Sequence, residues 1–157
     1  MADEIQLVVF KLKQQEAVCE YGVAITTVQE IIPMATPTKL PQTPDFIEGI
    51  INLRGKVIPI IDLKKRFNMG YSEVTPETRS VVVEVDGKTV GIIVDEVSEV
   101  MRLPVDSIEP PPAVIGGIAS DYITGVGKVD NRLLILLDMD KILNEGERTE
   151  LHDFAVK

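Results

Sequence analysis

Two stretches of the chain decide its fold: GVAITTVQEII at residues 22–32 and GIIVDEVSEVM at residues 91–101. At an offset of 69 residues most apolar positions stay apolar, and three residues recur in step: Gly22 with Gly91, Val28 with Val97 and Glu30 with Glu99. Self-similarity of this kind is typical of a duplicated structural unit. The sequence therefore predicts two copies of one supersecondary unit.

A second pair of stretches extends the repeat. FIEGIINLRGKVIPIIDLKK at residues 46–65 resembles YITGVGKVDNRLLILLDMDK at residues 122–141, which aligns Gly49 with Gly125 and Asp62 with Asp138. The offset here is 76 residues, so the loops between the two matches differ in length. Each copy spans roughly 70 residues.

Short apolar runs bounded by turn residues predict strands in both copies. Hairpins are expected from residues 6–12 with 17–25, 80–85 with 89–94, and 124–129 with 132–137. Further strands are expected at residues 28–32, 56–61 and 97–103. The proline-rich segments at residues 36–44 and 109–112 are expected to be loops, because proline cannot donate a ladder hydrogen bond.

Turn and cap residues recur at matched positions. Arg54-Gly55 and Asp130-Asn131 fall at hairpin tips, where Gly and Asn tolerate a positive φ. Asp62 and Asp138 each precede a short amphipathic run, at residues 62–67 and 138–144, where an aspartate can cap a helix. Each copy is thus predicted to be a five-stranded unit followed by a short helix.

Such short, curved sheets close into small barrels, which removes exposed edges. A lone unit of this size has a marginal core, so we expect the two barrels to pack side by side. We interpret residues 1–157 as one domain with two subdomains, about 15–80 and about 5–14 plus 81–150, with strand exchange as an option. A groove between the barrels is a place where a partner could bind.

Composition excludes several function classes. The formal net charge is −9, and the basic run Lys64, Lys65 and Arg66, expected to be a solvated helix face, is no counterion-releasing stripe, so nucleic acid is not an expected partner. The single cysteine, Cys19, and the single histidine, His152, do not make a disulfide framework or a zinc site. We expect no metal and no cofactor.

No targeting signal is expected from this sequence. The N-terminal residues MADEIQLVVF carry acids where a secretory signal would have Lys or Arg. No apolar run approaches the ~20 residues that a membrane-spanning helix needs. We therefore expect a soluble, cytoplasmic protein without direct membrane contact.

Catalytic arrangements are not supported. Asp62 and Asp138 could be paired acid–base carboxylates, but their matched positions before helical turns favour capping. Asp95 and Glu96 are adjacent in an extended run and point to opposite faces. GVGK at residues 125–128 lacks the spacing of a phosphate-binding loop. Because no nucleophile, base and orienting group come together, we expect a protein that is not an enzyme.

Binding residues are better supported. Arg54 presents a planar guanidinium beside a tight turn in the segment Asn52-Leu53-Arg54-Gly55. Glu30 lies among apolar residues of a strand and is a candidate partner for Arg54. The alternative is that both side chains are simply solvated. The second copy has Asp130 at the position of Arg54, which suggests that the first copy carries a specific contact.

The stretches quoted above, read together over residues 5–145, resemble the CheW family. The segment INLRG followed by VIPIIDL, with the downstream VGIIVDEVSEV, is the most specific part of the resemblance. It implies a mainly β CheW-like domain of two five-stranded SH3-like β-barrels packed side by side, with short helices after the barrel strands and at the C-terminus. It also implies a non-enzymatic adaptor that bridges the cytoplasmic tips of chemoreceptors and the regulatory domain of the histidine kinase CheA.

The resemblance assigns roles to individual residues. It implies receptor coupling by Arg54 with Asn52, Gly55 and Glu30, and kinase binding by Val28 with Ile31 and Ile32. A receptor contact in the inter-barrel groove is a further expectation, at Val81, Gly91 and Ile93.

Three rival interpretations have sequence discriminators. The regulatory end of the kinase itself would need an upstream ATP-binding domain, and a CheV-like adaptor would need a receiver domain; the printed 157 residues contain neither. A generic SH3-like peptide binder would display an aromatic groove. Four Phe, three Tyr and no Trp supply such a groove poorly.

Overall fold

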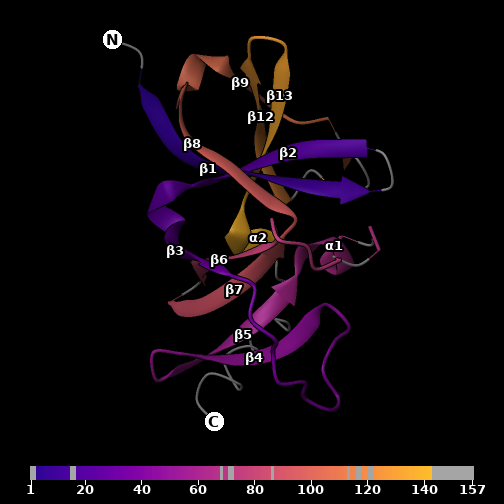
Figure 1. Ribbon diagram of the computed structural model, residues 1–157. Helices are drawn as coiled ribbons and strands as arrows, with labels where there is room; N and C mark the ends of the chain where they lie inside the picture. The colour runs from indigo at the N-terminus through magenta and orange to yellow at the C-terminus, as the bar shows by residue number, and fades with distance from the viewer. Residues whose placement is uncertain are drawn as a thin grey trace.

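The computed structural model describes residues 3–14, 17–67, 69–70, 73–85, 87–112, 114–115, 118–119 and 122–142. Figure 1 shows that the described part of the chain is mainly β, with the short helices α1 and α2. The first copy of the repeat contains β1 (Glu4–Gln14), β2 (Ala17–Ala24), β3 (Val28–Pro33), β4 (Ile47–Leu53), β5 (Lys56–Asp62) and α1 (Leu63–Arg66). The second contains β6 (Arg79–Val85), β7 (Lys88–Val94), β8 (Glu96–Pro104), β9 (Ile108–Glu109), β10 (Val114–Ile115), β11 (Ile118–Ala119), β12 (Ile123–Val129), β13 (Arg132–Leu137) and α2 (Met139–Ile142).

The strands form two main sheets. One has the order β3-β6-β7-β5-β4, the other has the order β8-β1-β2-β13-β12-β9, and β10 pairs with β11 separately. The mainly β architecture and the short helices after β5 and β13 are confirmed. The second sheet has six strands rather than five, because the two-residue β9 adds to the edge of β12.

Apart from β9, the two sheets contain matching strands in the same order. In one, Ile60 of β5 lies opposite Gly91 of β7 in a parallel pair; in the other, Leu136 of β13 lies opposite Gly22 of β2. These partners are related by the same offsets as the sequence repeat. A β-bulge before Glu30 in β3 recurs at the matched place in the β1–β8 pair. The duplication seen in the sequence is therefore a duplication of register as well.

Each copy of the repeat is divided between the sheets. The stretch at residues 22–32 leaves the six-stranded sheet as β2 and enters the five-stranded sheet as β3, through a 3-10 turn, η1 (Ile25–Thr27). The stretch at residues 91–101 crosses the other way, from β7 to β8. The hairpins β1–β2 and β6–β7 are thus exchanged between the copies.

Sheet membership differs from the subdomain bounds expected from the sequence. Strand β2 was expected with residues 15–80 but pairs with β1 and β13, and β6 and β7 were expected with the second subdomain but pair with β3 and β5. The exchange explains the difference, since a hairpin carries no local signal for the sheet it joins. We keep the division into two subdomains as a proposal, with bounds drawn by sheet.

Three apolar clusters hold this arrangement together. The largest lies between the sheets and draws on both, with Phe10 and Tyr21 from one and Val81 and Ile92 from the other. Smaller clusters fill the two barrels, around Leu134 in the six-stranded sheet and around the residues Ile58, Ile60, Val82 and Ile93 in the five-stranded sheet. The barrels are therefore joined by a shared core and not by a linker.

The local geometry agrees with the predicted caps. The Asp62 side chain accepts a hydrogen bond from the Lys64 backbone N–H at 3.0 Å, and the Asp138 side chain accepts one from the Asp140 N–H at 3.1 Å. Structural capping of α1 and α2 thus accounts for both aspartates. The expectation of a solvated basic face on α1 was wrong, because Lys64 is only 7% exposed.

The outer edge of β4 is covered by the proline-rich loop. Thr38 and Ile50 exchange two backbone hydrogen bonds of 2.8 and 3.0 Å. The chain passes so close that a Cβ added to Gly49 would lie 2.2 Å from the Thr38 carbonyl oxygen. Strand β9 covers the matched edge, where Glu109 pairs with Val126 of β12. Covering these two edges, of β4 and of β12, limits edge-to-edge association there.

Candidate functional site

The β4–β5 hairpin ends in a tight turn that presents Arg54. Arg54 and Gly55 have φ values of 52° and 87°, so both turn residues are left-handed, as a two-residue hairpin of this type requires. The Gly55 backbone N–H donates a 2.7 Å hydrogen bond to the Asn52 side-chain oxygen. These contacts fix the turn and leave the Arg54 side chain 69% exposed.

Arg54 forms a two-point ion pair with Glu30 of β3. Arg54 Nη1 donates to Glu30 Oε1 at 3.0 Å, and Nη2 contacts Oε2. The guanidinium hydrogen bond holds the pKa of Glu30 below its usual range. The hypothesis that these two residues pair is confirmed. Because β3 and β4 are the two ends of the sheet order, the pair ties the open ends of this barrel together.

The second copy makes a related contact with a different arginine. Glu99 matches Glu30, but Asp130 occupies the position of Arg54 at the hairpin tip. Arg132, two residues further on, donates to Glu99 at 3.2 Å and to Glu20 at 2.6 and 2.9 Å. Its guanidinium also lowers the pKa of Glu20. The sequence reasoning missed Arg132; the repeated Glu30 and Glu99 were the signal that could have found it.

The side chains of β3 face two ways. The bulge at the start of β3 places Val28 opposite Val83 and Ile31 opposite Val81, and both partners belong to the core between the sheets. Val28 is half-buried against that core, and Ile31 is 39% exposed. Ile32 packs instead against the small cluster inside the barrel. Val28 and Ile31 therefore share a face, and Ile32 lies behind it.

The three residues expected at an inter-barrel groove lie in the interior. Val81 is fully buried in the shared core, and Ile93, 3% exposed, lies inside the five-stranded barrel. Gly91 is also buried, and a Cβ there would approach Ile60 Cδ1 to 2.6 Å. These positions hold the barrels together and are not open to a partner in this conformation, so we leave them out of the proposed contacts.

Within the described part of the chain, no group of three His, Cys, Asp or Glu side chains is placed to hold a metal ion. The same residues contain no helix that is both long and apolar enough to cross a bilayer. Cys19 is partly buried against the core between the sheets. The features that stand out are thus the Glu30–Arg54 pair and, beside it, the partly exposed side of β3 that carries Val28 and Ile31.

Comparisons with known proteins agree with this architecture. A family model described as a CheW-like domain matches residues 6–147. The chain is 39% identical to the chemotaxis protein CheW of Klebsiella aerogenes over 136 residues, which cover 87% of this chain and 82% of that protein. It is 35% identical to CheW of Treponema pallidum over 155 residues, with coverage of 95% and 88%.

A solved structure is similar as well. The crystal structure of the scaffolding protein TtCheW from Thermoanaerobacter tengcongensis matches with a TM-score of 0.80 and 40% identity, over 92% of this chain and 90% of that one. The chain also matches the chemotaxis protein CheV3 of Helicobacter pylori at 32% identity, but spans only 50% of that longer protein.

Proposed function

Because the chain belongs to the CheW family, we propose that it is a non-catalytic cytoplasmic adaptor that couples chemoreceptors to the histidine kinase CheA. The relatives and the solved neighbour carry the names of chemotaxis and scaffolding proteins. The adaptor works through surface contacts alone, one to the receptor tip and one to the kinase regulatory domain.

The Glu30–Arg54 pair is the observation that carries the receptor part of the proposal. Arg54 is mostly exposed, yet its backbone turn is fixed by Asn52 and its guanidinium by Glu30. A pre-arranged charged group loses little entropy when it binds, so it is a suitable recognition element. We assign receptor coupling to Arg54, with Glu30, Asn52 and Gly55 as the residues that hold it in place.

The partly exposed side of β3 that carries Val28 and Ile31 supports the kinase part of the proposal. Val28 and Ile31 lie on one side of an edge strand, and a partner barrel can pack against that side. Partly exposed aliphatic side chains on an edge strand are stabilised by burial in a complex. We assign kinase binding to Val28 and Ile31, with Ile32 supporting the strand from inside the barrel.

Paired binding measurements test both assignments. We expect Arg54→His to weaken binding of a receptor-tip fragment and to leave binding of the kinase regulatory domain unchanged. Val28→Met should weaken binding of the kinase regulatory domain and leave binding of the receptor-tip fragment unchanged. Both fragments are titrated against each purified variant, with affinities from calorimetry and folding checked by circular dichroism.

The repeat supplies matched controls. Val97 is the counterpart of Val28 in the second copy and is likewise partly buried against the shared core, so Val97→Met introduces the same change elsewhere. Lys128→His removes an exposed cation from the other hairpin. If both test variants bind both partners like the controls, the site assignments are wrong. If the unmodified chain binds neither fragment, the adaptor function itself is refuted.

A further inference from the structure

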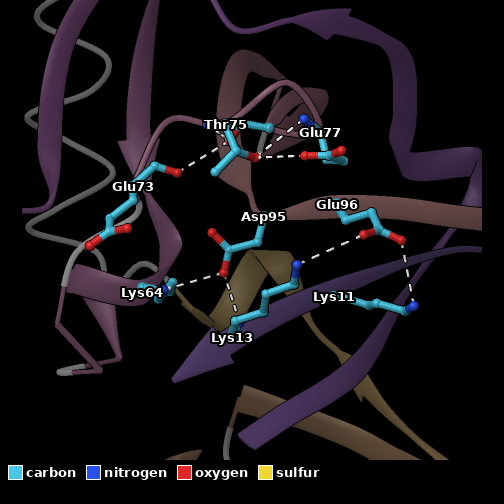
Figure 2. Close-up of polar contacts among 9 residues, drawn as sticks. Lys11, Lys13, Lys64, Glu73, Thr75, Glu77, Asp95 and Glu96 are labelled. Carbon is cyan, nitrogen blue, oxygen red and sulfur yellow. Dashed lines mark hydrogen bonds and ion pairs between the residues drawn. The ribbon is translucent and has the colours of Figure 1, made fainter. Parts of the chain in front are cut away.

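A buried cluster, formed by the side chains of Asp95 and Lys64 and the backbone N–H of Lys13, lies where the chain crosses between the sheets. Asp95 is the single residue between the end of β7, in the five-stranded sheet, and the start of β8, in the six-stranded sheet. Asp95 is only 7% exposed, although an aspartate is rarely buried in a protein unless it is paired. Figure 2 shows Asp95 in contact with Lys64 and Lys13. Glu96, which pairs with Lys11 and Lys13, lies beside it.

The contacts of Asp95 come from both barrels. Its Oδ2 accepts a 2.7 Å hydrogen bond from the backbone N–H of Lys13, which belongs to β1 of the six-stranded sheet. The same oxygen lies 3.3 Å from Lys64 Nζ, on the helix that follows β5 of the five-stranded sheet. The Asp95 N–H donates to the Lys11 carbonyl at 3.1 Å. One carboxylate thus joins an element of each barrel at the crossing.

Such a pair contributes little to the free energy of unfolding, because desolvation of two buried charges offsets their attraction. The apolar core between the sheets supplies the attraction, but apolar contact has no preferred direction. Hydrogen bonds and ion pairs are directional, and in a buried setting they select one arrangement among several with similar packing. The cluster is therefore suited to setting an angle.

The repeat indicates that the barrel unit itself does not need this cluster. At the other crossing, from β2 to β3, the position of Asp95 is held by Thr26, an exposed residue of the 3-10 turn η1. The counterpart of Lys64 in the second copy is Asp140, which is exposed. A buried ion pair thus lies at one crossing of this duplicated fold, and at the matched crossing an uncharged residue holds the position of Asp95.

We propose that Asp95, together with Lys64, is a positioning residue that fixes the angle at which the two barrels meet. A partner that contacts only one barrel is indifferent to this angle, whereas an assembly that engages both barrels requires it. That an assembly requires this angle rests on the proposed adaptor function, whereas the fixing of the angle by Asp95 and Lys64 does not. Loss of the cluster should therefore loosen the barrels without unfolding either one.

Distances between the barrels test the proposal without any partner. Spin labels are placed at Glu84→Cys in β6 and Lys128→Cys in β12, both exposed, in a Cys19→Ser background. The doubly neutral variant Asp95→Asn with Lys64→Met removes both charges at similar volume. We expect its distance distribution, measured by pulsed electron resonance, to be at least twice as broad as that of the parent, with an unchanged circular dichroism spectrum.

Two further variants keep the test decisive. Glu96→Gln alters the neighbouring carboxylate, which contacts Lys11 and Lys13 at 3.5 and 3.9 Å, and should leave the distribution unchanged. Lys64→Arg keeps both charges but moves the donor, so it should shift the mean distance even if the neutral variant does not fold. Distributions that superimpose on the parent for every folded variant of Asp95 and Lys64 would overturn the proposal, whatever the partners do.

Discussion

Replacing Gly49 by alanine combines two causes of destabilisation, an unfavourable backbone conformation and a steric clash. Gly49 has a φ of 145°, a conformation that is nearly closed to residues with a Cβ. The added Cβ would also lie 2.2 Å from the Thr38 carbonyl oxygen and 2.7 Å from its carbon, both in the backbone of the covering loop. Neither atom can move away by a change of rotamer, so the loop must shift.

The loss of unfolding free energy can be worked out from the backbone strain and the displacement of the loop. The backbone conformation costs ~1–3 kcal/mol for a non-glycine residue. Displacing the loop breaks the two hydrogen bonds between Thr38 and Ile50, at ~1 kcal/mol each. We expect Gly49→Ala to lower the free energy of unfolding by about 4 kcal/mol, a large part of the stability of a small domain.

Urea unfolding followed by circular dichroism measures the effect, with the slope of the transition used to check that the unfolded state is unchanged. Gly87→Ala is the control for strain alone, because Gly87 has a φ of 76° and nothing within 4 Å of an added Cβ. It should lose ~1–2 kcal/mol. Gly125→Ala matches Gly49 in the repeat and should lose ~1–3 kcal/mol by overpacking against Ile108.

The comparison refutes the reasoning if Gly49→Ala is no more destabilising than Gly87→Ala. That result would mean that the loop carrying Thr38 does not lie against β4 in solution. A loss in Gly125→Ala equal to that in Gly49→Ala would count against the strain term, because only Gly49 of the two has a positive φ.

Two further predictions concern the ion pairs. A double-mutant cycle on Glu30→Gln and Arg54→Gln should show coupling in the free energy of urea unfolding at neutral pH. The pKa of Glu30 is lowered in the folded state. The coupling is therefore complete above the ordinary pKa of 4.5 and disappears as the pH falls through the folded pKa. Equal coupling at all pH values would contradict this. Arg132→Gln should cost less than about 1 kcal/mol, since the arginine is partly exposed, and the loss should shrink in about 1 M salt; a loss independent of salt would rule out the electrostatic account.

The duplication was accessible from the sequence because it rests on local signals. Glycines at matched strand positions, Asp62 and Asp138 as caps, and the hairpin tip at Arg54 are all decided by neighbouring residues. The Glu30–Arg54 pair was also within reach, since an acid in an apolar strand calls for a nearby cation. These parts of the fold and the site were predicted.

What the sequence did not reveal depends on contacts between distant segments. Nothing local to β2 or β6 indicates which sheet the strand joins, so the exchange of hairpins was left open. The burial of Lys64 follows from its approach to Asp95, and the burial of Val81 follows from the face of the sheet on which the second barrel packs. The register of β13 against β2 likewise brings Arg132 to Glu20.

The exchange of hairpins has a consequence for how the molecule can be assembled. A chain that ended after α1 would own β1 and β2 of one barrel and β3, β4 and β5 of the other, and could complete neither. Two identical chains of that length could complete both by lending each other a hairpin, as in a domain-swapped dimer. The present polypeptide therefore has the topology of an intertwined pair whose halves are covalently fused, and during synthesis the first half must wait for the second.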